Sequence, residues 1–237
     1  MSRRLTITIT LALITFLTPS SWSGTSGTRE SRFGVYSHGF RIGEMFSTNS
    51  SGSDATADTL KYSSSTNIDA NFIVSSYRLE NHEEALVAKG GTLRYSRSSN
   101  ENGRSTQVNG TLENNAFVVT VSENNASRVL TFPRDHYEYT TMECPELHLK
   151  KEGDRMSARL LDLETLEIVT RRYTWVRSEE LQVGTMKYIF RVIDFEDKNK
   201  KCRRWIKPDT IGAIIARQEG HGKTGSYSVR LVAYRSR

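Results

Sequence analysis

The fold follows from the stretch Met186–Tyr234, which opens with MKYIFRVI and closes with SYSVRLVAY. In the first run, Met186, Tyr188, Phe190 and Val192 alternate with a second set, which is Lys187, Ile189, Arg191 and Ile193. In the second run, Tyr227, Val229, Leu231 and Ala233 alternate with Ser226, Ser228, Arg230 and Val232. Successive side chains of a β-strand point to opposite faces of a sheet, so a period of two predicts strands that are half buried. Between the runs lie CRRWI, a turn at Pro208-Asp209, and the apolar run IGAIIA. The stretch therefore predicts antiparallel strands joined by polar turns.

The rest of the chain shows the same pattern of alternating segments separated by turns. Turn signals separate short alternating segments, and they stand at Ser37-His38-Gly39, Asn100–Gly103, Asn114-Asn115 and Asn124-Asn125. Strands that recur roughly every ten residues between such turns are typical of an all-β meander. We expect a loop over residues 47–57 and an irregular segment or one short helix over residues 133–150. The predicted fold class is all-β, a single curved antiparallel sheet or partly open β-barrel with few or no helices.

The N-terminus predicts export. A short positive segment, Ser2-Arg3-Arg4, precedes an apolar run from Leu5 to Leu17, and Ser21-Trp22-Ser23 fits a small-x-small cleavage site. These features are those of a secretory signal peptide. We therefore expect a signal peptide over residues 1–23, a flexible lead-in over 24–32 and one antiparallel β domain over 33–237. The mature protein is expected to be periplasmic or secreted, without a stable transmembrane anchor.

Charge and cysteine content narrow the function classes. The formal net charge is +6, and it falls to +4 (6 − 2) when Arg3 and Arg4 are removed with the signal peptide. No dense stripe of Lys and Arg with interleaved aromatics appears, so no nucleic-acid partner is expected. Cys144 and Cys202 are the two cysteines of the chain. In an oxidising compartment such a pair forms a disulfide, and the alternative is two buried thiols.

Motifs for catalysis are weak. HGKT at 221–224 lacks the glycine and the following helix of a phosphate-binding loop. No G-x-S-x-G, H-E-x-x-H or CxxC pattern occurs. We predict no catalytic residue, no metal site and no cofactor. The alternative is an enzyme with its site near His136, Glu138 and His82.

One charged turn, DKNKKCRR at 197–204, stands out. The sequence favours a solvated hairpin turn whose charges protect a sheet edge. The other interpretation is a contact with anionic headgroups or polysaccharide.

Two patterns together resemble a known group of proteins. They are FxVYxxGxxIG at 33–43 and WxxxDxxG at 205–212, the second followed by YxVxL at 227–231. This layout after a signal peptide resembles an uncharacterised bacterial periplasmic domain family of unknown function, related to the lipoprotein-carrier-like β half-barrels. The resemblance implies a strongly curved sheet with a concave apolar face that binds something lipidic.

Alternating aromatics carry the functional hypothesis. They line either an apolar cavity or a packed core, because both arrangements place them on one face. We expect an exported, non-enzymatic protein that binds a hydrophobic or amphiphilic ligand, a lipid or similar amphiphile, in its concave face. The alternative is a structural or interaction module that contacts another envelope protein and binds no small ligand. The residues predicted to line the concavity are Phe33, Tyr36, Phe40, Tyr188, Phe190, Trp205 and Tyr227.

Overall fold

The computed structural model describes residues 27–54, 57–72, 75–124, 126–222 and 225–237. The predicted signal peptide, residues 1–23, lies outside these ranges. Within these ranges, fifteen strands form one sheet, accompanied by two short 3-10 helices. The elements are β1 (Gly27–Ser37), β2 (Phe40–Asp54), β3 (Ala57–Phe72), β4 (Ser75–Ala88), β5 (Gly91–Glu101), β6 (Arg104–Glu113), β7 (Ala116–Glu123), β8 (Ala126–Pro133), η1 (Arg134–His136), β9 (Tyr139–Thr140), η2 (Pro145–His148), β10 (Arg155–Asp162), β11 (Glu167–Val183), β12 (Met186–Glu196), β13 (Lys201–Asp209), β14 (Gly212–Gly222) and β15 (Gly225–Ser236).

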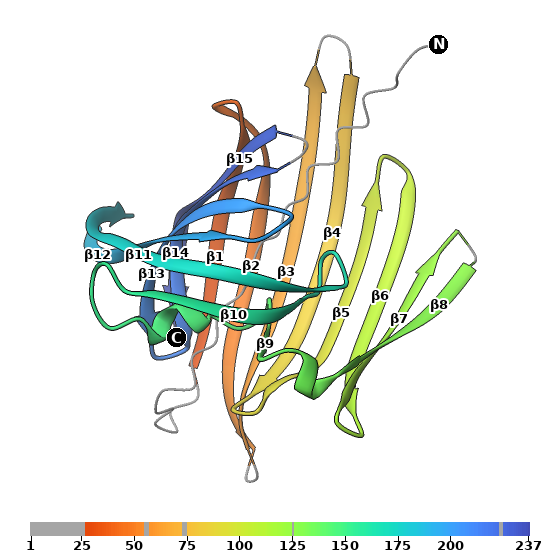
Figure 1. Ribbon diagram of the computed structural model, residues 1–237. Helices are drawn as coiled ribbons and strands as arrows, with labels where there is room; N and C mark the ends of the chain where they lie inside the picture. Colours follow the sequence, from red (N-terminus) through yellow and green to blue (C-terminus); the bar gives the residue numbers. More distant parts are fainter. Residues whose placement is uncertain (1–26, 55–56, 73–74, 125, 223–224) are drawn as a thin grey trace.

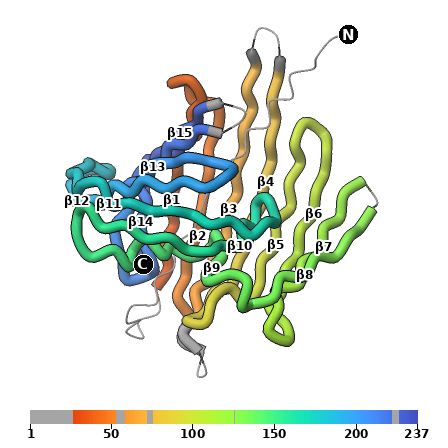
Figure 2. Tube along the Cα trace, viewed as in Figure 1, coloured from red at the N-terminus to blue at the C-terminus, as the bar shows by residue number. Residues whose placement is uncertain are grey.

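The sheet is one open, curved ribbon. Its strand order is β8-β7-β6-β5-β4-β3-β2-β1-β15-β14-β13-β12-β11-β10-β9. Neighbours are antiparallel except for β9, which pairs in parallel with Leu160 and Leu161 of β10. Figures 1 and 2 show β10 and β11 passing across the face of β2–β5, so the ribbon folds over itself. The predicted class, all-β with a partly open barrel-like sheet, is confirmed.

The boundaries differ from the sequence prediction at the N-terminal end. β1 begins at Gly27, so residues 27–32, predicted as a flexible lead-in, lie in a strand. β2 continues to Asp54 through most of the segment predicted as a loop. Its small polar residues pair regularly with β1 and β3. Long neighbouring strands can hold such residues in a ladder that their own weak strand propensity does not predict.

The core fills the space between the two halves of the ribbon. One buried cluster joins Leu60, Tyr62 and Tyr95 of β3–β5 to Leu161 of β10 and Leu163 after it. Further clusters lie beneath β1–β4 and among β10–β14. A fourth cluster, around Phe190 and Trp205, packs the other face of β12–β14 against β15. The inner face is therefore occupied largely by side chains from the opposite half of the sheet.

A carboxylate joins the two halves where β9 approaches β5. Glu143 Oε1 accepts from the backbone N–H of Thr92 at 3.3 Å and of Thr140 at 3.1 Å. It also accepts from both threonine hydroxyls at 3.1 Å. Burial raises the pKa of Glu143, whereas these hydrogen bonds oppose the shift. The short β9 is thus held against β5 without pairing in the ladder.

The predicted disulfide is wrong for this structure. Cys144 and Cys202 are buried and remain thiols, and no disulfide joins them. Each sulfur faces a different polar neighbour. Arg204 Nη1 lies 3.9 Å from the Cys144 Sγ, and the Tyr227 hydroxyl lies 3.6 Å from the Cys202 Sγ. The alternative interpretation, two buried thiols, describes the structure.

Gly43 stands at a close approach of β2 to β3. A Cβ added there would lie 2.2 Å from the Asn67 carbonyl oxygen and 2.9 Å from the Ile68 Cα. Both are backbone atoms, so neither strand can yield without distorting the ladder. We expect Gly43→Ala to lower the free energy of unfolding by about 2 kcal/mol in urea titrations. The control is Gly52→Ala on the same strand, where nothing lies within 4 Å. Equal stability of the two variants would contradict this account.

Candidate functional site

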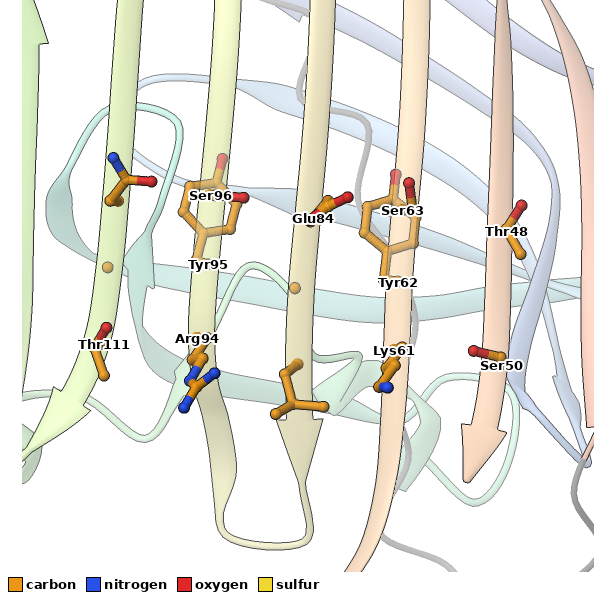
Figure 3. A pocket seen from close by; sticks show the side chains of 14 residues that line it. Thr48, Ser50, Lys61, Tyr62, Ser63, Glu84, Arg94, Tyr95, Ser96 and Thr111 are labelled. Carbon is orange, nitrogen blue, oxygen red and sulfur yellow. The ribbon is translucent and has the colours of Figure 1, made fainter. Parts of the chain in front are cut away.

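A groove of about 560 Å³ lies on the outer face of β2–β6. Figure 3 shows its lining side chains, with the C-terminal half of the chain behind the strands. Exposed residues alternate with buried ones along each strand, so the exposed set defines this face. The outward lining residues are Thr48, Ser50, Lys61, Ser63, Glu84, Leu86, Arg94, Ser96, Asn109 and Thr111. Tyr62, Ala85, Tyr95 and Gly110 complete the floor.

The strand register arranges these residues in two ladders. One ladder runs across five strands as Ser50, Lys61, Leu86, Arg94 and Thr111. The other runs as Thr48, Ser63, Glu84, Ser96 and Asn109. Hydroxyls and amides, which both donate and accept hydrogen bonds, make up four of the five side chains in the second ladder and two of the five in the first. The groove is therefore lined by many groups that can donate or accept hydrogen bonds.

Two cations give the groove its charge character. Lys61 and Arg94 flank Leu86 at the same level of the sheet, with their backbones two strand spacings apart, about 10 Å. Within the described residues, neither cation has an ion pair, whereas Arg78 on β4 pairs with Asp69 at 2.9 Å. The carboxylate that lines the groove, Glu84, contacts His82, with 3.2 Å between Glu84 Oε1 and His82 Nε2. The groove thus holds two cations without ion pairs around one apolar side chain, and the Glu84 carboxylate lowers its net charge to about one positive.

Behind the groove, the inner face carries a cluster of buried charges, called here the interior charge cluster. It consists of Glu83 and Arg97 on β4 and β5, Asp162 and Glu164 at the end of β10, Arg171 on β11, and Asp197 and Lys200 before β13. Arg171 donates to Asp162 at 3.0 Å and to Asp197 at 2.8 Å. Lys200 lies 2.9 Å from Asp162 and 3.0 Å from Glu164. Arg97 donates to the Glu164 carbonyl oxygen at 3.4 Å. The cluster joins β4–β5 to the C-terminal half of the sheet.

Three carboxyl groups of this cluster, those of Glu83, Asp162 and Glu164, have pKa values shifted from their ordinary ones. Burial raises the pKa of Glu83 to about 7, although the Tyr95 hydroxyl, which donates to it at 2.5 Å, and Arg97 oppose the shift. Burial would also raise the pKa of Asp162, but Lys200 and Arg171 hold it below its ordinary value. Neighbouring acids in one cluster thus respond to different pH ranges.

The seven predicted lining aromatics do not form one surface. Phe33 and Tyr227 lie in the cluster beneath β1–β4, and Phe190 and Trp205 lie in the cluster on the other face of β12–β14. Tyr188 packs beside the second cluster, and its hydroxyl accepts from Tyr234 at 2.6 Å. Tyr36 lies under the exposed Arg230, 4.8 Å from ring centroid to guanidinium carbon. Phe40 stands at the end of a turn with 73% of its surface exposed.

The residues of the enzyme alternative are not joined either. His136 lies in η1, and its Nε2 atom is 4.0 Å from the carboxylate of the adjacent Asp135. Glu138 accepts from the backbone N–H of Arg159 at 2.8 Å. His82 points outward from β4 toward Glu84. No hydrogen bond or ion pair connects His82 with the other two in the part of the chain that the structure describes.

Sequence reasoning also missed the burial of the charged turn at 197–204. Asp197 and Lys200 belong to the interior charge cluster, and Arg204 is 1% exposed with Glu146 and Gln218 as partners. A signal was available, because Arg204 falls between Cys202 and Ile206 on the alternating inward face of β13. A charged residue at an apolar position of a strand indicates a buried partner elsewhere.

Comparisons with known proteins give a fold and no activity. No protein-family model matches the chain, and no curated protein matches it. Among solved structures, the chain is similar to the crystal structure of a beta-barrel-like protein of domain of unknown function DUF1849 from Brucella abortus. The TM-score is 0.60 at 10% identity, and the match covers 89% of this chain and 98% of that one. The likeness supports an uncharacterised β-barrel-like fold. Within the described residues, no helix is long and apolar enough to span a membrane.

Proposed function

We propose that this protein is an exported, non-enzymatic protein of the cell envelope that binds an amphiphile with an anionic headgroup. The N-terminal sequence supports export, since residues 1–23 have the pattern of a signal peptide. The observation that carries the binding proposal is the pair Lys61 and Arg94, two cations without ion pairs in a groove of about 560 Å³. The headgroup lies between them, and its hydroxyls or ester oxygens meet the serines and threonines of the ladders.

The outer groove suits this role better than the inner face. The inner face is filled by packed clusters, and its charges largely neutralise one another. In the groove, Lys61 and Arg94 have no ion pairs within the described residues, and Leu86 supplies an apolar contact for the part of the ligand next to the headgroup. A lone phosphate would gain nothing from Leu86, whereas an amphiphile uses both features.

The test uses dihexanoyl phosphatidylglycerol, a soluble lipid with one negative charge, titrated calorimetrically into the mature protein. We expect Lys61→Gln and Arg94→Gln each to weaken binding about fivefold, since an exposed charge contact contributes about 1 kcal/mol. The double variant is expected to lose measurable binding. Arg128→Gln on β8, where the side chain is exposed, serves as the matched control and leaves affinity unchanged.

Dihexanoyl phosphatidylcholine, which carries the same phosphate with a compensating cation, is expected to bind more weakly. The proposal would be contradicted if both lipids bound with equal affinity and if the double variant bound them as tightly as the unmodified protein does. That result would favour the alternative, an interaction module that uses a sheet edge such as β8, where Val129 is 63% exposed.

A further inference from the structure

We propose that anion binding in the outer groove is coupled to the charge of Glu83 on the opposite face of the same strands, so that the groove holds its ligand more tightly when Glu83 is neutral. The inference rests on the proposed function and concerns the regulation of that site.

Glu83 lies directly behind the groove. It precedes Glu84 and Ala85, which line the groove, and strand alternation turns its side chain inward. Across the ladder it stands opposite Ser64 of β3 and Arg97 of β5. The Tyr95 hydroxyl that binds its carboxyl belongs to a residue of the groove floor. One layer of backbone therefore separates the Glu83 carboxyl from the bound headgroup.

The groups that face Glu83 come from four segments. They are Tyr62 on β3, Tyr95 and Arg97 on β5, Asp162 and Glu164 at the β10–β11 connection, and Lys200 before β13. Asp162 is held ionised by Lys200 and Arg171, and burial raises the pKa of both tyrosines far above neutrality. Burial also raises the pKa of Glu164, while Lys200 beside it opposes that shift. Among these groups, Glu83 changes charge near pH 7, because its pKa is about 7.

The coupling is electrostatic. Side chains extend about 5 Å to each side of a sheet, and Glu83 stands three residues, about 10 Å, along β4 from the level of Lys61, Leu86 and Arg94. The Glu83 carboxyl therefore lies about 14 Å from a headgroup held between the two cations. At that distance a new negative charge weakens anion binding between about 1.6-fold, for a water-like dielectric, and about sevenfold, for a partly buried one. The low-dielectric sheet lies between the two charges, so screening by salt acts chiefly on the outer face.

The experiment measures the affinity for dihexanoyl phosphatidylglycerol at pH 5.5, 7 and 8.5. The charge of this phosphodiester is constant over the range, so any change comes from the protein. We expect affinity to fall about fivefold from pH 5.5 to pH 8.5, and Glu83→Gln to remove the change and keep the tight binding seen at low pH.

One control variant tests whether the pH dependence of binding comes from Glu83. The His82 imidazole contacts the Glu84 carboxylate beside the groove, so His82→Gln is measured in parallel and is expected to retain the pH dependence. If Glu83→Gln kept the dependence, or if His82→Gln alone removed it, the coupling would be refuted. Binding that depends on Lys61 and Arg94 but is constant with pH would refute the coupling and leave the proposed function intact. Absence of binding at every pH would refute the proposed function itself.

Discussion

Arg171→Ala is expected to lower the free energy of unfolding by about 3–5 kcal/mol. The guanidinium is 1% exposed and is shared by two carboxylates, those of Asp162 and Asp197, which are themselves buried. Alanine leaves both acids in the interior with half of their compensating charge removed. Lys200 still contacts Asp162, but Asp197 loses its buried cation. Removing one partner of a buried ion pair costs far more than the pair contributes, because the remaining charge is stranded away from water.

The neighbouring residue is a matched control. Arg172 follows on the same strand, points to solvent and pairs with Glu196 at 2.8 Å with 73% of its side chain exposed. Arg172→Ala is expected to change stability by less than about 0.5 kcal/mol, the range of an exposed pair. Urea titration of both variants at pH 7 gives the comparison. A loss of less than about 1 kcal/mol for Arg171→Ala would show that water reaches the interior charge cluster.

The sheet itself could be predicted because strand alternation and turn residues are local signals. The run from Met186 became β12, and the turn at Ser37-His38-Gly39 joins β1 to β2, with positive φ at both His38 and Gly39. Such signals depend on a few neighbouring residues, which the sequence shows directly. The irregular segment at 133–150 was predicted for the same reason, since its prolines interrupt the pattern, and it holds η1, β9 and η2.

The site could not be predicted, because it depends on the register of strands distant in sequence. Lys61 and Arg94 become neighbours across β4 only once β3, β4 and β5 are paired. Neither sequence segment contains a signal that predicts this pairing. The interior charge cluster is even harder to predict from the sequence. Arg171 alternates with Val169 and Tyr173 and so marks a buried position. Its partners are Asp162, the last residue of β10, and Asp197, in the connection before β13, and both stand beside residues that resemble ordinary polar turns.

The aromatic residues predicted to line one concavity lie in separate clusters, for a related reason. A period of two assigns residues to faces of one strand but does not state which face is inner once the ribbon bends over itself. In β12, Val192 and Ile193 are adjacent and both fully buried, because both faces of that strand are covered. The alternation therefore predicted that Phe190 and Phe33 line the same surface, whereas in the structure they pack in different clusters.

The stability of the protein is expected to fall as pH rises from about 5 to about 8, and Glu83 is expected to account for up to about 3 kcal/mol of that change. Its pKa is raised from the ordinary 4.5 to about 7. The folded state thus binds this proton more tightly than the unfolded chain does. The resulting stabilisation is fully present below pH 4.5 and is lost as pH rises through about 7. Burial raises the pKa of Glu143 and Glu164 too, so they act in the same direction.

Glu83→Gln separates this contribution from the others. The amide is neutral at every pH and can still accept from the Tyr95 hydroxyl, so the variant mimics the protonated carboxyl. Urea titrations at pH 5, 6, 7 and 8 should give similar stabilities for the two proteins at pH 5 and a growing advantage for the variant above pH 6. Glu84→Gln, one residue away on the exposed face, should reproduce the wild-type profile. Parallel pH profiles for wild type and Glu83→Gln would mean that Glu83 is ionised without cost, and that the interior charge cluster is solvated from the open end of the sheet.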